Sequence, residues 1–322
     1  MAMISDIPKL VTVFGGTGFL GRYVVQALAR RGYRVRVACR DPHTAIHVQT
    51  LGNMGQVQPI QANLRYRWSI DRAVAGADHV VNLVGVLHES GRQNFGALHV
   101  AGARAVAEAA QAAGATLTHT SAIGADLHSP AGYGRTKAQG ELAVSKAMPG
   151  AVIMRPSIVF GPEDKFFNRF ANMARFSPFL PLIGGGHTKF QPVYVGDVAE
   201  AYAQSAAGLL EPGIYELGGP QILTFRECME EMLDVIDRKK TLVSIPWPIA
   251  RLQARILGLL PKPMLTPDQV SMLETDNVVS EEARRQGHTL EGMGIARHSL
   301  QAILPTYLWT YRPSGQFTQP QA

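Results

Sequence analysis

The stretch Val11–Gly21, VTVFGGTGFLG, limits what this chain can fold into more than any other part of the sequence. A short apolar run is followed by Gly15, Gly18 and Gly21 and then by apolar residues at helical spacing, which predicts a strand, a tight turn and a helix. Glycines in such a turn permit a sharp bend, close approach of the backbone to a pyrophosphate, and tight packing of helix on strand. A glycine-rich connection without a ligand has the same pattern, but the position directly after a strand favours nucleotide binding.

Strand-like and helix-like segments alternate along the first half of the chain. The next strand candidates are Tyr33–Ala38, Gln56–Gln61, His79–Val84, Ala115–Thr120 and Ala151–Met154, and the helix candidates include Trp68–Ala75 and Val100–Ala113. A nearly unbroken apolar strand is typical of parallel sheets, which are covered on both faces. The alternation predicts an α/β fold, a Rossmann-type doubly wound parallel sheet. Ligands bind at the carboxyl ends of such strands, where we expect Arg40, Gly85 and Ser121 to meet the glycine turn.

The second part of the chain has a different pattern. A further strand is expected at Gln191–Val195, ahead of a helix, and shorter helices with proline-rich links follow from Gly219 onward. We therefore expect an NAD(P)-binding domain over residues 8–218, in which residues 162–190 reach into a smaller, mainly helical C-terminal subdomain. That subdomain is expected over residues 219–322 and to end in a loose tail.

Composition limits the classes of partner. The net charge of +6 suits an anionic cofactor, an acidic partner or a membrane face, and the spread of basic residues along the chain does not favour nucleic acid. Cys39 and Cys228 have no metal-binding spacing, so we expect reduced thiols and no metal site. No apolar run approaches the roughly 18 residues of a membrane-spanning helix. The N-terminal MAMISDIPKL resembles neither a secretory signal nor a transit peptide, which favours a cytoplasmic bacterial protein.

The end of the second strand bears on which dinucleotide is bound. An NAD-binding unit carries an acidic residue about 20 positions beyond the glycines, which accepts a hydrogen bond from the ribose 2′-hydroxyl. Here Cys39 and Arg40 occupy that position. Because an arginine can pair bidentately with a 2′-phosphate, we expect NADP(H) in preference to NAD(H), and a solvated loop arginine is the alternative. The third strand ends near Asn63 and Leu64, where contact with the adenine is expected.

Tyr133 and Lys137 stand four residues apart in YGRTK, at the start of an expected helix. They share one helical face, and a lysine ammonium beside a phenol would lower the pKa of Tyr133 toward that of a general acid or base. Ser121, at the end of the preceding strand, is placed to hydrogen-bond the same substrate oxygen. A pair of surface residues has the same spacing, and the position behind a dinucleotide motif favours the catalytic interpretation.

The segment 247–260 predicts an amphipathic helix. Its apolar side is formed by Ile249, Leu252, Ile256 and Leu259, and Arg251 and Arg255 lie on another side. We expect the apolar side to pack on the chain's own domain, and docking on a membrane or a partner is the alternative.

Four motifs, GGTGFLG, YGRTK, RPSIVFGP and VYVGDVAEA, stand in order along the chain. Together they resemble the extended and atypical short-chain dehydrogenase/reductase superfamily, over most of the chain's length. The stretches RPSIVFGPEDKFFNRFANMARFSP and LLPKPMLTPDQVSMLETDNVVSE are similar to one branch of it. That branch contains the NAD(P)H-binding accessory subunits of respiratory complex I and their alphaproteobacterial counterparts. The resemblance implies complex I subunits as partners and a peripheral place at the cytoplasmic face of a bacterial inner membrane.

The family pattern carries over to individual residues. It places the pyrophosphate at Gly15, Gly18 and Gly21, the 2′-phosphate at Arg40, and the nicotinamide ribose at Tyr133 and Lys137. The remaining cofactor contacts that it implies are Thr17, Phe19, Leu20, Asn63, Leu64, Val84, Gly85, Pro156 and Ile158. In active relatives the tyrosine is the general acid or base, the lysine lowers its pKa, and a serine or threonine at the position of Ser121 orients the substrate.

Two departures from the family pattern bear on catalysis. His99 stands where extended members carry an asparagine, and Ser121 lies 12 residues before Tyr133, whereas active sugar-nucleotide epimerases have a longer insertion. We therefore predict an NADP(H)-binding accessory subunit of complex I in which the cofactor is largely structural and turnover is small or absent. The alternative is a free NADP(H)-dependent short-chain reductase or sugar-nucleotide epimerase/dehydratase that uses Tyr133 and Lys137.

Overall fold

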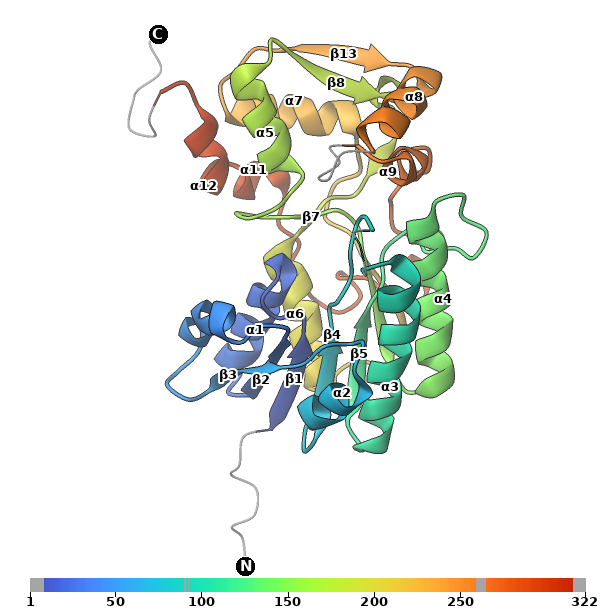
Figure 1. The fold of residues 1–322 in the computed structure, drawn as a ribbon. Helices are drawn as coiled ribbons and strands as arrows, with labels where there is room; N and C mark the ends of the chain where they lie inside the picture. The colour runs from blue at the N-terminus through green and yellow to red at the C-terminus, as the bar shows by residue number, and fades with distance from the viewer. Residues whose placement is uncertain (1–8, 90, 92, 259–264, 315–322) are drawn as a thin grey trace, which may run out of the picture.

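The computed structural model describes residues 9–89, 91, 93–258 and 265–314 (Figure 1). Seven parallel strands form one sheet in the order β3-β2-β1-β4-β5-β6-β11. They are β1 (Leu10–Phe14), β2 (Arg34–Cys39), β3 (Val57–Gln61), β4 (His79–Asn82), β5 (Thr116–Thr120), β6 (Val152–Pro156) and β11 (Gly213–Leu217). This is the strand order of a Rossmann fold with one strand added beside β6, and the predicted doubly wound sheet is confirmed.

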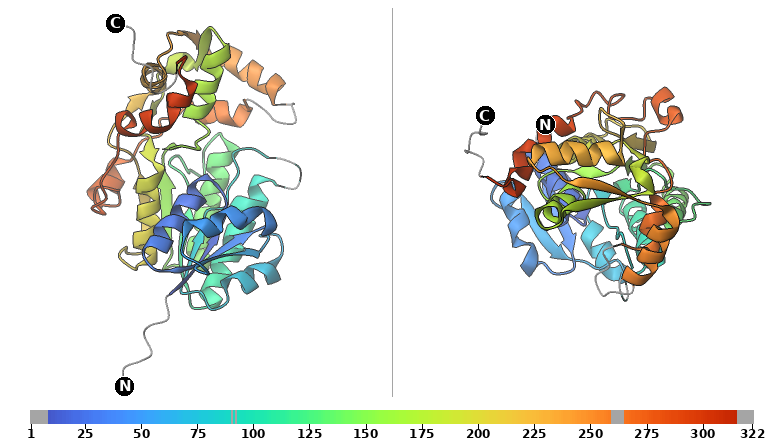
Figure 2. Two further views of the ribbon diagram at one scale, coloured as in Figure 1. Left: turned by 90° about the vertical axis from the view of Figure 1, so that its left-hand side faces the viewer. Right: turned by 90° about the horizontal axis from the view of Figure 1, so that it is seen from above.

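Helices cover both faces of the sheet (Figures 1 and 2). One face carries α1 (Phe19–Arg30) and α6 (Val195–Ala206), and the other carries α2 (Arg67–Val74), α3 (Ala103–Ala112) and α4 (Gly132–Ala147). The side chains of β1 alternate between the two helix layers. Val11 and Val13 pack with α1 and α6, and Phe14 packs on the opposite side.

Two elements differ from the sequence-based expectation. The helix expected at 100–113 becomes α-helical only at Ala103, and a π-helical turn, η2 (Gly96–Gly102), precedes it. A Cβ at Gly140 would lie 2.1 Å from the carbonyl oxygen of His99, so glycine there allows α4 to contact η2 closely. The strand expected at 191–195 is reduced to β10 (Val193–Tyr194), which pairs with β7 (Val159–Phe160) outside the main sheet.

A smaller C-terminal lobe stands beyond the carboxyl ends of the strands (Figure 1). Its elements are α5 (Phe167–Phe176), β8 (Phe179–Ile183), α7 (Phe225–Val235), β13 (Thr241–Ile245), α8 (Trp247–Leu257), α9 (Pro267–Met272), α11 (Leu300–Ile303) and α12 (Pro305–Leu308). The lobe also contains η3 (Gly184–Gly186), β9 (Lys189–Phe190), β12 (Leu223–Thr224) and η4 (Trp309–Tyr311), whereas η1 (His43–Leu51) and α10 (Glu281–Arg285) belong to the sheet domain. Buried residues of α5, β8, α7, α11 and α12 form the lobe's core.

After α9 the chain returns to the sheet domain. The Ser157 hydroxyl donates to Asn277 Oδ1 at 2.6 Å, and Leu290 and Ile295 are buried in the core beside α6. Residues 277–298 therefore pack on the sheet domain although they lie in sequence between α9 and α11, which belong to the C-terminal lobe. The division into 8–218 and 219–322 as folding units stays a prediction.

Helix α8 packs through the face opposite to the one expected. Ala250 and Ala254 are buried against Val270 of α9, where their small side chains allow close contact. The large apolar residues Ile249, Leu252 and Ile256 are exposed. The prediction that they pack on the chain's own domain is wrong. Leu259 and Leu260 lie outside the described residues.

Candidate functional site

The glycine turn connects β1 to α1 at the carboxyl end of the sheet. Gly15 has a φ of 80°, in the left-handed region that glycine adopts without strain. A Cβ on Gly21 would lie 2.3 Å from the carbonyl oxygen of Gly15, so a side chain there would force α1 away from the turn. The N–H of Gly18 donates to the same oxygen at 3.0 Å. The glycine spacing therefore sets how α1 begins.

The N-terminus of α1 is left open for an anion. Gly18 is its N-cap, no side chain caps the helix, and its first turn contains no acidic residue. The unpaired N–H groups and the positive end of the helix dipole are suited to a phosphate. Thr17, Phe19 and Leu20 lie at this end and are half-buried. These features fit a pyrophosphate, and the assignment of these residues to cofactor binding stays a prediction.

Arg40 directly follows β2, at the neighbouring strand end. It is exposed, and its guanidinium forms no hydrogen bond or ion pair with another residue in the described part of the chain. The adjacent carboxylate of Asp41 accepts a hydrogen bond from the N–H of His43 at 3.1 Å and so holds the turn into η1. Cys39 is buried, and its thiol faces the carbonyl oxygen of Ile60. The strand end thus offers an unpaired cation, and the acid beside it, Asp41, is engaged in the turn.

Two further strand ends contribute to the same edge. Asn63 follows β3 and accepts a hydrogen bond from the N–H of Arg65 at 3.1 Å, which shapes the turn, and Leu64 beside it is half-buried. Val84 follows β4, and its N–H donates to Asn82 Oδ1 at 3.1 Å. These contacts fix the loops at which the adenine and nicotinamide contacts are predicted.

Tyr133 and Lys137 lie in the first turns of α4, beside the ends of β4 and β5. Lys137 is buried, and its Nζ donates to the carbonyl oxygen of Thr120 at 3.0 Å. The same Nζ lies 5.8 Å from the centre of the Tyr133 ring. A Cβ at Gly85 would lie 3.2 Å from this Nζ, so glycine leaves room for the ammonium group. The fold brings Tyr133, Lys137 and Gly85 together at the carboxyl edge of the sheet. We call this edge, from the glycine turn to Tyr133 and Lys137, the cleft.

The pKa values in this part of the cleft differ from the sequence-based expectation. Burial, followed by the charge of Asp268, raises the pKa of Tyr133 to about 12. Burial lowers the pKa of Lys137 to about 8. The ammonium group is held by a backbone carbonyl, and no hydrogen bond joins it to the phenol oxygen among the described residues. The predicted lowering of the Tyr133 pKa is therefore wrong for this structure.

His99, at the position of the family asparagine, is buried in η2. Its Nε2 accepts a hydrogen bond from the N–H of Val86 at 3.2 Å, and its Nδ1 lies 3.1 Å from Thr136 Oγ1. The ring stacks on Phe95 and meets the Tyr133 ring edge-on, with ring centres 5.2 and 5.5 Å apart respectively. Burial lowers the pKa of His99 to about 3. It is thus a neutral imidazole that supports the tyrosine ring.

A carboxylate from the C-terminal lobe closes the N-terminus of α4. Asp268 on α9 accepts hydrogen bonds from the N–H groups of Gly132 and, at 3.0 Å, of Tyr133. Sequence reasoning missed this residue. The sequence signals the start of α9, because Thr266 and Gln269 form a capping box, but it does not reveal that Asp268 caps a different helix.

The ends of β5 and β6 hold the remaining predicted residues. Ser121 follows β5 and is buried, and its hydroxyl has no hydrogen-bond partner among the described residues. Such a group normally pairs with a ligand, water or protein atom. Pro156 ends β6, and Ile158 lies two residues farther on. Because β5 and β6 are neighbours, these residues share one part of the cleft.

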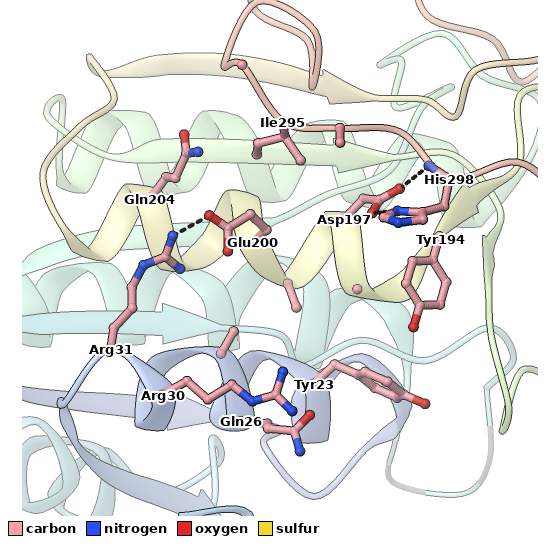
Figure 3. A pocket seen from close by; sticks show the side chains of 15 residues that line it. Tyr23, Gln26, Arg30, Arg31, Tyr194, Asp197, Glu200, Gln204, Ile295 and His298 are labelled. Carbon is pink, nitrogen blue, oxygen red and sulfur yellow. Dashed lines mark hydrogen bonds and ion pairs between the residues drawn. The ribbon is translucent and has the colours of Figure 1, made fainter. Parts of the chain in front are cut away.

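A groove of about 770 Å³ lies elsewhere, between α1 and α6, and none of the predicted site residues lines it (Figure 3). Arg31 and Glu200 form an ion pair across it. Asp197, from the motif VYVGDVAEA, accepts hydrogen bonds from the backbone N–H of His298 at 2.8 Å and from its ring at 2.6 Å. This part of the motif therefore ties the returning chain to α6 and does not contact the cofactor cleft.

Residues 9–89, 91, 93–258 and 265–314 contain no group of three histidine, cysteine, aspartate or glutamate side chains arranged to hold a metal ion. Cys39 and Cys228 are buried free thiols. Over the same ranges, no helix has both the length and the apolar character needed to cross a bilayer.

The model of the NAD dependent epimerase/dehydratase family matches residues 11–218, the part of the chain that forms the sheet and the cleft. The chain belongs to this family. The chain is also similar to a protein of Arabidopsis thaliana, the mitochondrial NADH dehydrogenase (ubiquinone) 1 alpha subcomplex subunit 9, which is 37% identical over 97% of this chain and 80% of its own length. The ceramide reductase of Caulobacter vibrioides is 33% identical over 76% of this chain and 76% of its own.

Solved structures share the fold of this chain. The NADPH-dependent quinone oxidoreductase of Escherichia coli, solved with NADPH, has a TM-score of 0.71 at 20% identity and covers 90% of this chain and 97% of its own. At this identity the likeness concerns the fold alone. The predicted NAD(P)-binding Rossmann fold is confirmed, and the Arabidopsis relative confirms the resemblance to complex I subunits. The preference for NADP(H) and the bacterial origin stay predictions.

Proposed function

We propose that this chain is an accessory subunit of a respiratory NADH:quinone oxidoreductase, which binds NADP(H) and turns over little or no substrate. The observation that carries the proposal is the 37% identity to the Arabidopsis complex I subunit over 97% of the chain. That likeness extends beyond residues 11–218, which the general family model covers, into the C-terminal lobe. A shared C-terminal lobe favours a shared assembly, since the nucleotide-binding fold alone is common to many enzymes.

The residues of the cleft fit NADP(H). The open N-terminus of α1 would hold the pyrophosphate, and the unpaired Arg40 would hold the 2′-phosphate. Lys137 and Tyr133 would hold the nicotinamide ribose. The buried Ser121 hydroxyl would gain the partner that it lacks within the described chain. When bound, this cofactor supplies a hydride for carbonyl reduction.

Three features favour a cofactor that is structural. Burial raises the pKa of Tyr133 to about 12, so its phenol gives up its proton less readily than an ordinary tyrosine, which disfavours the proton exchange of a general acid or base. The Lys137 ammonium is held by the Thr120 carbonyl and does not stabilise a phenolate. Both ring nitrogens of His99 are engaged, so it offers no free group for proton transfer. This part of the cleft can bind a ribose but is poorly arranged to move a proton.

We further propose a bacterial source and a peripheral position at the cytoplasmic face of the inner membrane, held there by the oxidoreductase. The support is the similarity of residues 155–178 and 259–281 to the alphaproteobacterial counterparts of the complex I subunits. In this position the chain would bind other subunits directly and would need no membrane-spanning segment of its own.

Affinity purification tests the proposal. The chain is tagged at its C-terminus, membranes are solubilised gently, and co-purifying proteins and released nucleotide are identified by mass. We expect NADH:quinone oxidoreductase subunits and activity in the eluate, with NADPH in a one-to-one ratio to the tagged chain. An untagged strain is the control. A free soluble oligomer without oxidoreductase subunits would contradict the proposal.

The second candidate is a free NADP(H)-dependent reductase. The similarity to the Caulobacter ceramide reductase favours it, as does the presence of Tyr133, Lys137 and Ser121 together at the cleft. The substitution Tyr133→Phe separates the two candidates. A reductase would lose about two to four decades of turnover while keeping its nucleotide affinity. An accessory subunit would support the same oxidoreductase activity before and after the change.

A further inference from the structure

Helix α8 presents its large apolar side chains to solvent. Ile249, Leu252 and Ile256 are 51%, 59% and 61% exposed, and their spacing places them on one face of the helix. The helix packs on the lobe through Ala250 and Ala254 instead. Contiguous exposed apolar side chains mark surfaces that bind something. The outward face of α8 is therefore a candidate binding surface.

The strand pair next to α8 extends this apolar face. Phe179 on β8 and Val243 on β13 are 52% and 41% exposed. Phe179 pairs with Thr241, two residues before Val243, so both apolar side chains lie on the outer face of the pair. Figures 1 and 2 show β8, β13 and α8 at the end of the molecule farthest from the sheet domain. We call Phe179, Val243, Ile249, Leu252 and Ile256 the α8 surface.

The segment that carries β13 and α8 is positively charged. Residues 238–258 include five lysines and arginines and no aspartate or glutamate. Arg251 is paired with Glu274 at 2.7 Å. The side chains of Lys239, Lys240 and Arg255 form no hydrogen bond or ion pair with other described residues. Unpaired cations thus flank an exposed apolar stripe.

We propose that the α8 surface docks on an anionic lipid bilayer, with α8 lying in the plane of the headgroups. An apolar helical face flanked by lysine and arginine is the pattern of an interfacial helix. Unpaired cations near a negatively charged membrane add attraction, whereas the core of a protein interface is depleted of lysine. This inference deepens the proposed function, because it names the surface of the accessory subunit that faces the membrane.

Vesicle flotation of the purified full-length chain tests the inference. The vesicles consist of phosphatidylcholine with or without phosphatidylglycerol, at equal lipid concentration. We expect the chain to float with the anionic vesicles, and to do so less at high salt because salt screens the attraction. The triple variant Ile249→Ser, Leu252→Ser, Ile256→Ser should bind far more weakly, by roughly tenfold for each apolar side chain removed.

A second variant tests the charges and a third serves as the control. Changing Lys239, Lys240 and Arg255 to glutamine should weaken binding to anionic vesicles by roughly fivefold for each residue. The matched control replaces three exposed apolar residues of the sheet domain by serine, and it should bind like the unmodified chain. These residues are Ile46, Met54 and Leu209. Thermal unfolding establishes that each variant is folded.

Three results would overturn the inference. The first is that the unmodified chain fails to float with anionic vesicles. The second is that the control triple variant loses as much binding as the α8 variant. In the third, the α8 variant keeps its vesicle binding and loses only its co-purification with oxidoreductase subunits, which would make the α8 surface a protein interface. Because flotation uses the isolated chain, its failure leaves membership of the oxidoreductase to be decided by co-purification.

Discussion

Two helices begin at the cleft, and the N-terminus of one is uncapped whereas the other is capped by a carboxylate. The N-terminus of α1 has glycine as its cap and no side chain or acidic residue near its first N–H groups. The N-terminus of α4 is closed by Asp268, which reaches across from the C-terminal lobe. Both ends carry the positive pole of a helix dipole. One pole is therefore left uncapped, as the proposed pyrophosphate site requires, and the other contacts the C-terminal lobe through Asp268.

The two helix N-termini are therefore stabilised in different ways. The α1 end depends on backbone geometry, since the close approach of Gly21 to Gly15 leaves no space for a side chain. The α4 end depends on buried titratable groups, among them Lys137 and His99. Changes of pH should therefore act mainly through the buried groups around α4, and changes of side-chain volume should act at the glycine turn before α1.

The largest expected effect is acid destabilisation. Burial lowers the pKa values of His99 in η2 and His119 in β5, on the α4 side of the sheet, to about 3. It lowers the pKa of His79 in β4, whose ring faces the α6 side through Thr118 and Ser205, to about 4. Below pH 6.5 the unfolded chain binds protons that the folded chain does not, so stability falls as pH decreases toward 4. Each histidine contributes about 1.4 kcal/mol per pH unit in this range. Urea unfolding at several pH values measures this slope.

A single substitution provides the control for the acid effect. The change His79→Gln should remove about a third of the slope that the three histidines produce, because glutamine does not titrate. An unchanged slope would mean that His79 is not the neutral, buried group described here, and that other groups cause the acid loss.

The next effect is a steric one at the α1 end. Gly21→Ala would place a Cβ 2.3 Å from the Gly15 carbonyl oxygen, and backbone atoms on both sides prevent an easy shift. We expect a loss of about 1–3 kcal/mol in the free energy of unfolding, together with loss of nucleotide binding. Gly150→Ala is the matched control, since a Cβ there meets nothing within 4 Å. Equal melting temperatures and nucleotide affinities for the two variants would refute the packing argument.

The contrast between the two ends also explains what the sequence could and could not predict. The glycine turn is local, so the run from Val11 to Gly21 was enough to predict its geometry, and the sheet followed from the apolar strands. Asp268 lies far along the chain from the helix that it caps, and the outward rotation of α8 depends on Ala250 and Ala254 finding Val270. Such contacts are decided by which surfaces meet in three dimensions.

The predicted lowering of the Tyr133 pKa was wrong for a related reason. The spacing of Tyr133 and Lys137 places them on one helical face, but it does not specify the partner of the ammonium group. In the folded chain that partner is the Thr120 carbonyl, and burial raises the tyrosine pKa. Desolvation and hydrogen-bond partners follow from the tertiary fold, so motif spacing alone does not give the direction of the shift.

A smaller effect concerns ligand selectivity at the α1 end. Arg40→Ala removes the unpaired guanidinium beside β2, which should weaken NADPH binding by roughly 10- to 100-fold, the range expected for a charge-assisted hydrogen bond. NADH lacks the 2′-phosphate, so its affinity should change little. Calorimetric titration with both nucleotides measures the difference, and Arg65→Ala, at another exposed loop arginine, is the control. Equal losses for NADPH and NADH would contradict the role of Arg40.

The smallest effect tests the α4 end directly. Asp268→Ala removes the carboxylate that accepts the N–H groups of Gly132 and Tyr133, and should cost about 1 kcal/mol of stability, as the loss of a helix cap does. Asp268→Asn keeps an acceptor oxygen and should retain most of that stability. Both changes remove a negative charge that raises the Tyr133 pKa, so this pKa should fall in each variant, as ultraviolet titration can detect.

Hydrogen exchange should quicken at α9 and the start of α4 in the alanine variant while the first turn of α1 stays protected. If exchange quickens equally at α1, the two helix ends are not the separate units described here, and the α1 end also depends on the contact between the lobes.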